Sequence, residues 1–187
     1  MHTPGLKVAV PSTAYDAKGL LKTAIRGDDP VLFLEHKRLY QMQGEVSEEE
    51  YLIPFGSASV KQEGNDLTIV ATQLMLHRSL EAAAKLAADG IQADVIDPRT
   101  VVPLDKKTIL SSVEKTGRLL VVEEGCRTSG IGAEISAIVA EEGIEFLDAP
   151  IRRIGVPDIP IPFSPPLENY VIPDTDKIVK VATSFFI

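Results

Sequence analysis

Hydrophobic and polar residues follow two alternating patterns along the chain. Short continuous apolar runs, which are typical of buried strands, occupy residues 5–11, 31–36, 67–72, 91–98, 118–124 and 149–157. Between them, apolar residues recur at the spacing of one helix face, as in residues 14–25, 76–87 and 131–139. Strands that alternate with helices are typical of a parallel sheet covered by helices, so the sequence predicts an α/β fold.

Polar residues at the ends of these segments support the predicted helices. Thr13 is followed three residues later by Asp16, a variant of the capping box, and Asp105 precedes a further helical segment. Asp174 begins a last helix with an acidic first turn, which suits the positive end of the helix dipole. Glycines that can end helices follow three of the segments: Gly90, Gly117 and Gly143.

Two stretches interrupt the alternation. Residues 37–64 carry the acidic run "EEE" and few periodic positions, so we expect a surface linker between a small unit, residues 1–36, and a larger one, residues 65–187. Residues 157–174 are rich in proline and are expected to form a loop. Because the small unit has few strands, we expect exposed strand edges that favour self-association.

The composition narrows the class of protein. The chain has 187 residues, of which 44% are hydrophobic and 25% charged, as in ordinary globular proteins. A net charge of -8 argues against nucleic-acid binding. There is no apolar run of about 18 residues for a membrane span and no N-terminal secretion signal. Cys126 is the single cysteine and has no base beside it, so we expect no internal disulfide, no nucleophilic role and a cytoplasmic location.

The segment "GRLLVVEEGCRTSGIGAEIS" joins a strand to a helix through glycines, as phosphate-binding loops do. Gly125 and Gly130 have the glycine spacing of a P-loop, but Ile131 stands where its lysine is needed. Gly130 and Gly132 begin a dinucleotide fingerprint, but Ile135 takes the place of its third glycine. The sequence therefore favours a structural turn over a phosphate site.

Few polar side chains have the spacing of a catalytic or metal site. The histidines, His2, His36 and His77, are far apart and show no metal-ligand spacing. His36 ends a predicted buried strand, where parallel sheets often place functional groups, and it is the strongest candidate of the three. Glu123 and Glu124 are adjacent in a predicted strand and should point to opposite faces, so they are not expected to form a catalytic pair.

The segment "AIRGDDP", residues 24–30, follows a predicted helix. Carbonyl groups at a helix end lack partners within the helix and, together with a carboxylate, can coordinate a hard cation. A plain helix end with a turn at Gly27 explains the same residues, and on the sequence alone this simpler interpretation is favoured.

Several blocks, in order along the chain, resemble the β subunit of thiamine-diphosphate-dependent 2-oxo acid dehydrogenase E1 components. They include "PGLKVAVPSTAYDAKGLLKTAIRGDDPVLFLEHKRLY", "IPFGSASVKQEGNDLTIVA", "GAEI" and "LDAPIRRIGVPDIPIPFSPPLE". The resemblance implies that residues 65–187 form a three-layer sandwich like the C-terminal domain of transketolase, with a mostly parallel sheet. It implies that residues 1–36 are the C-terminal remnant of a pyrimidine-binding domain, a partial α/β unit.

The resemblance also implies an incomplete active site. Family members are longer, and their catalytic glutamate and histidine are expected before Met1, so His2 does not take the histidine's role. Their partner, the E1 α subunit, holds thiamine diphosphate and magnesium. We therefore expect part of an oxidoreductase that is inactive alone, with no catalytic or cofactor-binding residue of its own.

Two binding sites follow from the resemblance. Backbone carbonyls and one side chain are implied to bind a structural potassium ion; the residues are Ala24, Ile25, Gly27 and Asp29. Gly27 and Asp29 replace the Asp and Asn expected from relatives, but Asp29 keeps an oxygen donor. The basic subunit-binding domain of an E2 acyltransferase is expected to dock at Asp148 and at the terminal carboxylate of Ile187, and the acidic net charge suits this docking.

Two other functions remain open. The chain could be a non-catalytic assembly module of the transketolase C-terminal type. It could also belong to a transketolase or a 1-deoxyxylulose-5-phosphate synthase, although the blocks "LDAP" and "VPDIPIPFSPPLE" fit these less well. The resemblance leans toward acetoin or pyruvate as substrate rather than a branched-chain 2-oxo acid.

Overall fold

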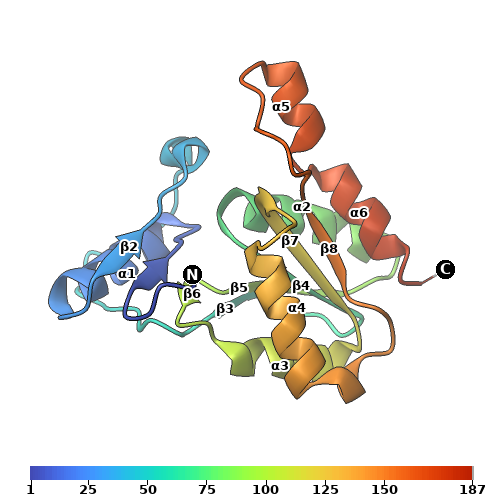
Figure 1. Ribbon diagram of the computed structural model, residues 1–187, viewed down its shortest axis with the longest axis horizontal. Coiled ribbons are helices and arrows are strands. Elements are labelled where there is room, and N and C mark those ends of the chain that lie inside the picture. Colours follow the sequence, from blue (N-terminus) through green and yellow to red (C-terminus); the bar gives the residue numbers. More distant parts are fainter. Residues whose placement is uncertain (187) are drawn as a thin grey trace.

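The computed structural model describes residues 1–186, which form two sheets and their covering helices (Figure 1). The elements in chain order are β1 (Lys7–Ala9), α1 (Ala14–Arg26), β2 (Val31–Phe33), the 3-10 helix η1 (Lys37–Gln41), β3 (Ser59–Gln62), β4 (Leu67–Ala71), α2 (Gln73–Ala88), β5 (Ala93–Asp97), β6 (Thr100–Val102), α3 (Lys106–Thr116), β7 (Leu119–Cys126), α4 (Ile131–Glu142), the 3-10 helix η2 (Ile144–Phe146), β8 (Arg152–Val156), α5 (Pro165–Val171) and α6 (Thr175–Thr183). Strands and helices alternate, which confirms the predicted α/β class.

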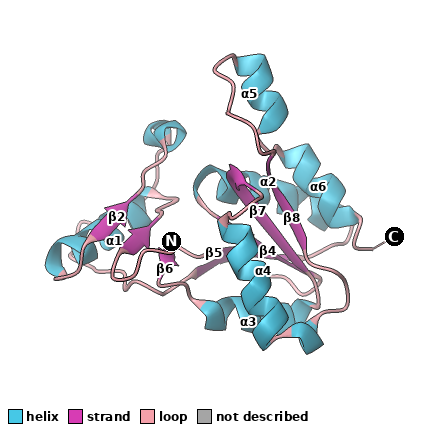
Figure 2. Ribbon diagram, in the orientation of Figure 1, coloured by secondary structure: helices cyan, strands magenta, loops and turns pink. Residues whose placement is uncertain are grey.

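The larger sheet is the centre of a three-layer sandwich. Its strand order is β3-β5-β4-β7-β8, and all neighbours are parallel except the edge strand β3. Along β4, Ile69 contributes to the core under α2 and α6, whereas Val70 contributes to the core under α3 and α4. Because successive strand residues face opposite sides, one sheet serves two cores. The predicted three layers are confirmed (Figure 2).

The smaller sheet has the strand order β2-β1-β6. β1 runs parallel to β2 but antiparallel to β6, with Val8 paired to Val102. β6 follows β5 directly, so the larger unit supplies one strand of the smaller sheet. β6 was not predicted from the sequence, because three residues carry too little periodicity.

The predicted helix ends are confirmed. The Oγ1 atom of Thr13 accepts a hydrogen bond from the backbone N–H of Asp16 at 3.1 Å. Asp105 and Asp174 cap α3 and α6 in the same way, at 3.1 Å and 2.7 Å. Gly117 adopts the left-handed conformation (φ 67°) after α3, which glycine tolerates without strain.

Regular structure also forms in the two stretches that were expected to lack it. η1 and β3 fall within residues 37–64, and β3 extends the larger sheet as its antiparallel edge. The expectation of a loop through residues 157–174 is wrong at α5, which begins with Pro165. Proline suits the first turn of a helix, where its missing N–H would have no partner in any case. α5 projects from the body of the molecule (Figure 1). Within residues 1–186, none of these helices is long and apolar enough to cross a membrane.

Candidate functional site

The glycine-rich turn between β7 and α4 encloses a buried carboxylate. Glu123 is 3% exposed, and its Oε1 atom accepts a hydrogen bond from the backbone N–H of Gly132 at 3.1 Å. A Cβ atom at Gly130 would overlap Oε2 of Glu123, and one at Gly132 would lie 2.6 Å from Oε1. Burial raises the pKa of Glu123, although the hydrogen bonds from this turn act against the rise. Glu123 thus occupies the place at the helix N-terminus where a phosphate would bind.

Glu124 points to the opposite side of β7, as predicted for adjacent strand residues. Its Oε2 atom lies 2.8 Å from Nε2 of His36. The Nδ1 atom of His36 accepts a hydrogen bond from the backbone N–H of Arg38 at 3.2 Å, so the proton of the neutral ring belongs on Nε2, which donates to Glu124. His36 lies beyond the end of β2 and caps η1, and its ring has a structural partner on each nitrogen.

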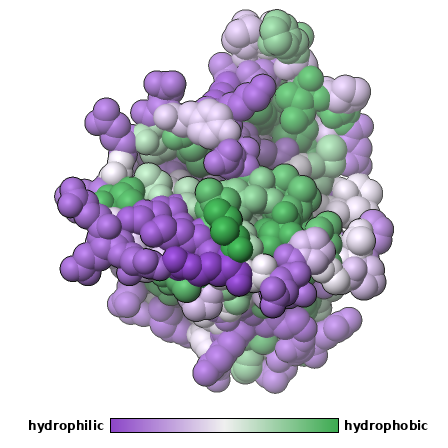
Figure 3. Space-filling model, turned by 90° about the vertical axis from the view of Figure 1, so that its left-hand side faces the viewer, coloured by the Kyte–Doolittle hydropathy of each residue, from purple (hydrophilic) through white to green (hydrophobic). Residues whose placement is uncertain are grey.

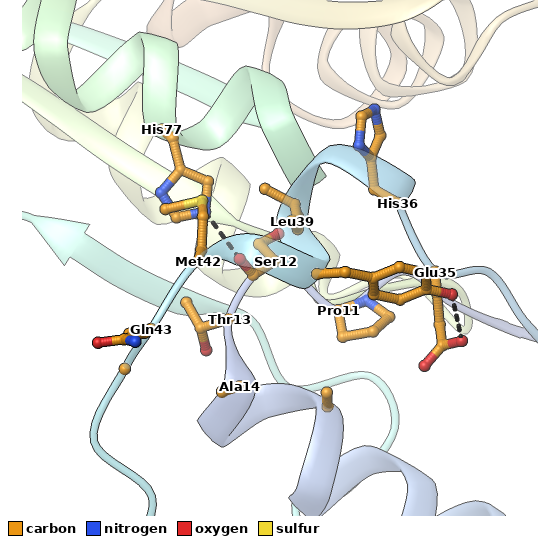
Figure 4. A pocket seen from close by; sticks show the side chains of 13 residues that line it. Pro11, Ser12, Thr13, Ala14, Glu35, His36, Leu39, Met42, Gln43 and His77 are labelled. Carbon is orange, nitrogen blue, oxygen red and sulfur yellow. Dashed lines mark hydrogen bonds between the residues drawn. The ribbon is translucent and has the colours of Figure 1, made fainter.

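A pocket of about 290 Å³ lies between the first turn of α1, η1 and α2. His77 points from α2 toward Ser12, and its Nε2 atom lies 2.7 Å from the Ser12 carbonyl oxygen (Figure 4). The ring of His36 points away from the other side chains in this view. Tyr40 donates a hydrogen bond at 2.9 Å to Glu35, which raises the pKa of Tyr40. The pocket can hold an apolar group. The hydroxyls of Ser12 and Thr13 in its lining already bond to Gln73 and Asp16, which gives them structural roles.

A buried ion cluster joins α1 to β3 and to the turn after β5. Asp16 is fully buried, and its carboxylate lies 2.8 Å from Nζ of Lys61 and 2.7 Å from Nε of Arg99. Thr13 donates a further hydrogen bond to it at 2.6 Å. Burial alone would raise the pKa of Asp16, but Lys61 and Thr13 hold it below its usual value.

Asp97 ends β5 beside this cluster and is also fully buried. Its Oδ1 atom accepts a hydrogen bond from the backbone N–H of Arg99 at 2.9 Å, whereas Oδ2 has no well-aligned hydrogen-bond partner among residues 1–186. Burial raises the pKa of Asp97 to about 6, since the charged form is poorly solvated there. Asp97 was not a candidate in the sequence analysis, although its place at a strand end was a usable signal.

The carboxyl edge of the larger sheet contains three strained residues. Gln73, Arg99 and Ser129 follow β4, β5 and β7, with φ angles of 51°, 60° and 57°. Open α/β sheets bind ligands at this edge. Here the smaller unit docks against part of it, since the backbone N–H of Gln73 donates to Oγ of Ser12 at 2.8 Å.

The predicted cation residues lie at the end of α1 as expected. The carbonyl of Ala24 accepts a hydrogen bond from Gly27 at 3.4 Å, and Ile25 is exposed. The carboxylate of Asp29 lies 2.7 Å from Nζ of Lys7. Over the described residues, no three His, Cys, Asp or Glu side chains converge as metal ligands.

The remaining candidates are dispersed. Asp148 is exposed, and its N–H donates to the carbonyl of Gly117 at 2.8 Å. Ile187 lies outside the described residues. Cys126 is exposed at the end of β7, and His2 is exposed near the chain start.

Comparison with known proteins establishes the family. The profile of "Transketolase, C-terminal domain" matches residues 56–178, more than half of the chain. The chain belongs to the transketolase C-terminal domain family. The profile of "Transketolase, pyrimidine binding domain" matches residues 1–43 of this transketolase-type chain.

Individual relatives support the resemblance seen in the sequence. The chain is 51% identical to the β subunit of acetoin:2,6-dichlorophenolindophenol oxidoreductase of Bacillus subtilis, covering 95% of this chain and 52% of that protein. It is 50% identical to the pyruvate dehydrogenase E1 component subunit beta of the same organism, covering 96% and 55%. The chain thus spans about half the length of the curated relatives it matches.

A solved structure has the same fold. A split-gene transketolase, described as an inactive β4 tetramer, matches with a TM-score of 0.82 and 28% identity, covering 98% of this chain and 58% of that one. The transketolase-type fold inferred from the sequence is therefore confirmed.

Proposed function

We propose that the chain is the C-terminal portion of the β subunit of a 2-oxo acid dehydrogenase E1 component, of the pyruvate or acetoin type. In this proposal it supports oxidative decarboxylation and acyl transfer to E2 lipoyl groups through subunit assembly. The observation that carries the proposal is the 50–51% identity to E1-type β subunits over 95–96% of the chain. The 2-oxoisovalerate dehydrogenase β subunit of Bacillus subtilis is 49% identical, so these identities do not separate the substrates.

The described residues do not fit thiamine diphosphate by themselves. The glycine-rich helix N-terminus that could hold a diphosphate is filled by the carboxylate of Glu123. No three acidic, histidine or cysteine side chains converge within residues 1–186 to hold magnesium. We therefore assign thiamine diphosphate and magnesium to a full assembly with an E1 α subunit, and we expect the chain alone to be inactive.

Exposed apolar side chains support association with further subunits. β2 is an edge strand, and large apolar side chains are exposed on it and on α1; they are Leu21, Ile25 and Leu32. Figure 3 shows the side of the molecule on which this unit lies, where an apolar area borders hydrophilic residues. We expect this unit to self-associate or to dock on a larger subunit. The exposed Cys126 suits a reducing compartment, and we place the assembly in the cytoplasm.

Two smaller parts of the proposal concern partners at the surface. Exposed Asp148 is proposed to meet the basic subunit-binding domain of an E2 acyltransferase, together with Ile187, whose part rests on the resemblance alone. A potassium ion is proposed at Ala24, Ile25, Gly27 and Asp29. Its occupancy requires Asp29 to exchange its contact with Lys7 for one with the cation.

The test is a calorimetric titration of thiamine diphosphate with magnesium into the chain, first alone and then with a purified E1 α subunit. We expect no binding at micromolar concentrations by the chain alone. Restored binding and decarboxylation when a longer β chain replaces this one would support the E1 assignment. Tight binding by the chain alone would contradict it.

The second candidate function is a non-catalytic assembly module. The absence of a complete site within residues 1–186 favours it as the alternative. A different outcome would replace the E1 assignment by the module interpretation. In that outcome an E1 α subunit binds the chain, but decarboxylation is not restored when longer β chains are used in its place.

A further inference from the structure

We propose that Arg127 and Arg153 bind the phosphate group of a small metabolite at the carboxyl edge of the larger sheet. The site is a hollow of about 330 Å³ beside the ends of β7 and β8. Thr128, Pro157 and Asp158 complete its lining. Ligands of open α/β sheets bind outside the carboxyl ends of the strands, which is where this hollow lies. The proposal goes beyond the E1 assignment and does not depend on it.

Close packing over glycines positions both arginines. A Cβ atom added at Gly155 would lie 3.1 Å from the Cγ atom of Arg127, and one added at Gly132 would lie 3.3 Å from the Cδ atom of Arg153. Each arginine side chain therefore packs directly against a glycine. The Nη1 atom of Arg153 also donates a hydrogen bond at 2.9 Å to the carbonyl oxygen of Arg127. The two side chains therefore have defined places, and less conformational entropy is lost when a ligand binds.

The charges in the hollow are not balanced by ion pairs. Within residues 1–186, neither Arg127 nor Arg153 takes part in an ion pair. Asp158 shares the hollow, but its Oδ2 atom accepts a hydrogen bond from Thr128 at 2.6 Å. Glu123 attracts Arg153 at longer range, from its buried place under α4. Arg127 and Arg153 give the hollow two positive charges against the one negative charge of Asp158, which leaves an excess of positive charge for an anion to meet.

The donor set favours phosphate among the common anions. Each guanidinium has five N–H donors in a planar fork that matches phosphate and carboxylate oxygens. With the single carboxylate of Asp158, these two groups leave the hollow positive, and a phosphate monoester, whose charge is about -1.5 to -2 near pH 7, is attracted to it more strongly than a singly charged carboxylate. The phosphate would meet side chains on the outer side of the turn, because Glu123 already occupies the start of α4.

The test is a titration of inorganic phosphate into the 187-residue chain at constant ionic strength. Binding is measured by calorimetry and by the NMR signals of the arginine side chains. We expect saturable binding with a Kd of about 1–10 mM, since charge-assisted bonds to an exposed site are modest. Arg127→Gln and Arg153→Met should each weaken binding about tenfold. Arg152→Ala is the matched control, because the guanidinium of Arg152 lies over the ring of Phe185 and outside the hollow.

A variant that removes negative charge provides a second readout. Asp158→Asn keeps an oxygen that can accept from Thr128 and should tighten phosphate binding about threefold, an effect that a purely structural role would not produce. Absence of saturable binding, equal weakening by Arg152→Ala, or acetate binding as tightly as phosphate would overturn the proposal. If circular dichroism shows that the Arg153→Met variant is unfolded, the test relies on the Arg127→Gln variant, because Arg127 is exposed and its substitution should leave the fold intact.

Discussion

The Nε atom of Arg99 lies 2.7 Å from the Oδ1 atom of Asp16, across the boundary between the two sheets. Arg99 follows β5 of the larger sheet, whereas Asp16 lies in the first turn of α1, which belongs to the smaller unit. The two atoms attract each other as an ion pair, although neither makes a well-aligned hydrogen bond within the described part of the chain. Together with Lys61, this contact holds the smaller unit against the carboxyl edge of the larger sheet.

Asp16→Asn should strongly destabilise the chain. The substitution removes the only carboxylate within residues 1–186 that directly contacts both Lys61 and Arg99, which are mostly buried, and breaking a buried pair costs about 3–5 kcal/mol. Urea unfolding measures the free energy of unfolding of the variant. Asp28→Asn is the control, since Asp28 is exposed and should change the stability by less than about 0.5 kcal/mol. Equal effects of the two substitutions would show that the cluster does not hold the units together.

Asp97 should give the stability a characteristic pH dependence. Its pKa in the folded chain is about 6, above the usual 3.8, so the folded state retains its proton where the unfolded state has lost it. Its stabilising contribution is therefore complete below about pH 4 and is lost as the pH rises through about 6. Asp97→Asn should remove this slope and stabilise the chain above pH 7 by up to about 3 kcal/mol.

The neighbouring carboxylate of Asp16 does not hide this effect. The pKa of Asp16 is lowered, so Asp16 loses its stabilising contribution only below the usual pKa of 3.8, outside the window in which Asp97 titrates. Urea unfolding at about pH 4.5 and about pH 7.5 compares the parent chain and the variant. Parallel pH profiles for the two proteins would refute the assignment of the slope to Asp97.

Gly130→Ala should destabilise the turn before α4 by at least about 2 kcal/mol. The φ angle of Gly130 is -75°, which alanine adopts freely, so the cost is steric. The added Cβ atom would overlap the carboxylate of Glu123 and the carbonyl oxygen of Cys126, and the second of these belongs to the backbone. Gly44→Ala is the matched control because its nearest contact would be an ordinary 3.9 Å. A thermal melt with no difference between them would contradict a tightly packed turn.

Potassium binding predicts ion-specific stabilisation. Potassium chloride should raise Tm by about 2–4 °C over choline chloride at equal ionic strength, because a ligand that binds only the folded state stabilises it. Asp29→Ala should abolish the difference, whereas Asp28→Ala, on the neighbouring exposed residue, should preserve it. If Tm depends on ionic strength alone, the proposed site at the end of α1 is not a potassium site.

The two glutamates at the end of β7 show how far local patterns reach. Their opposite orientation was predicted, because it depends on the period of a strand. Their partners were not predicted, since Glu124 meets His36 from a distant part of the chain and Glu123 accepts a hydrogen bond from Gly132, which lies nine residues later in α4. The incomplete glycine fingerprints argued against a phosphate in the turn, but they did not reveal that the carboxylate of Glu123 lies at the start of α4.

The α/β class, the helix ends at residues such as Thr13 and Gly117, and the resemblance to E1 β subunits could all be inferred from the sequence. The first two depend on side chains a few positions apart, where backbone geometry and capping act locally. Three features became visible only in the folded chain: β6 completes the smaller sheet, Asp16 and Arg99 meet, and two arginines share one hollow. Such contacts join residues far apart in the chain, and their strength comes from burial and charge that exist only once the layers have packed.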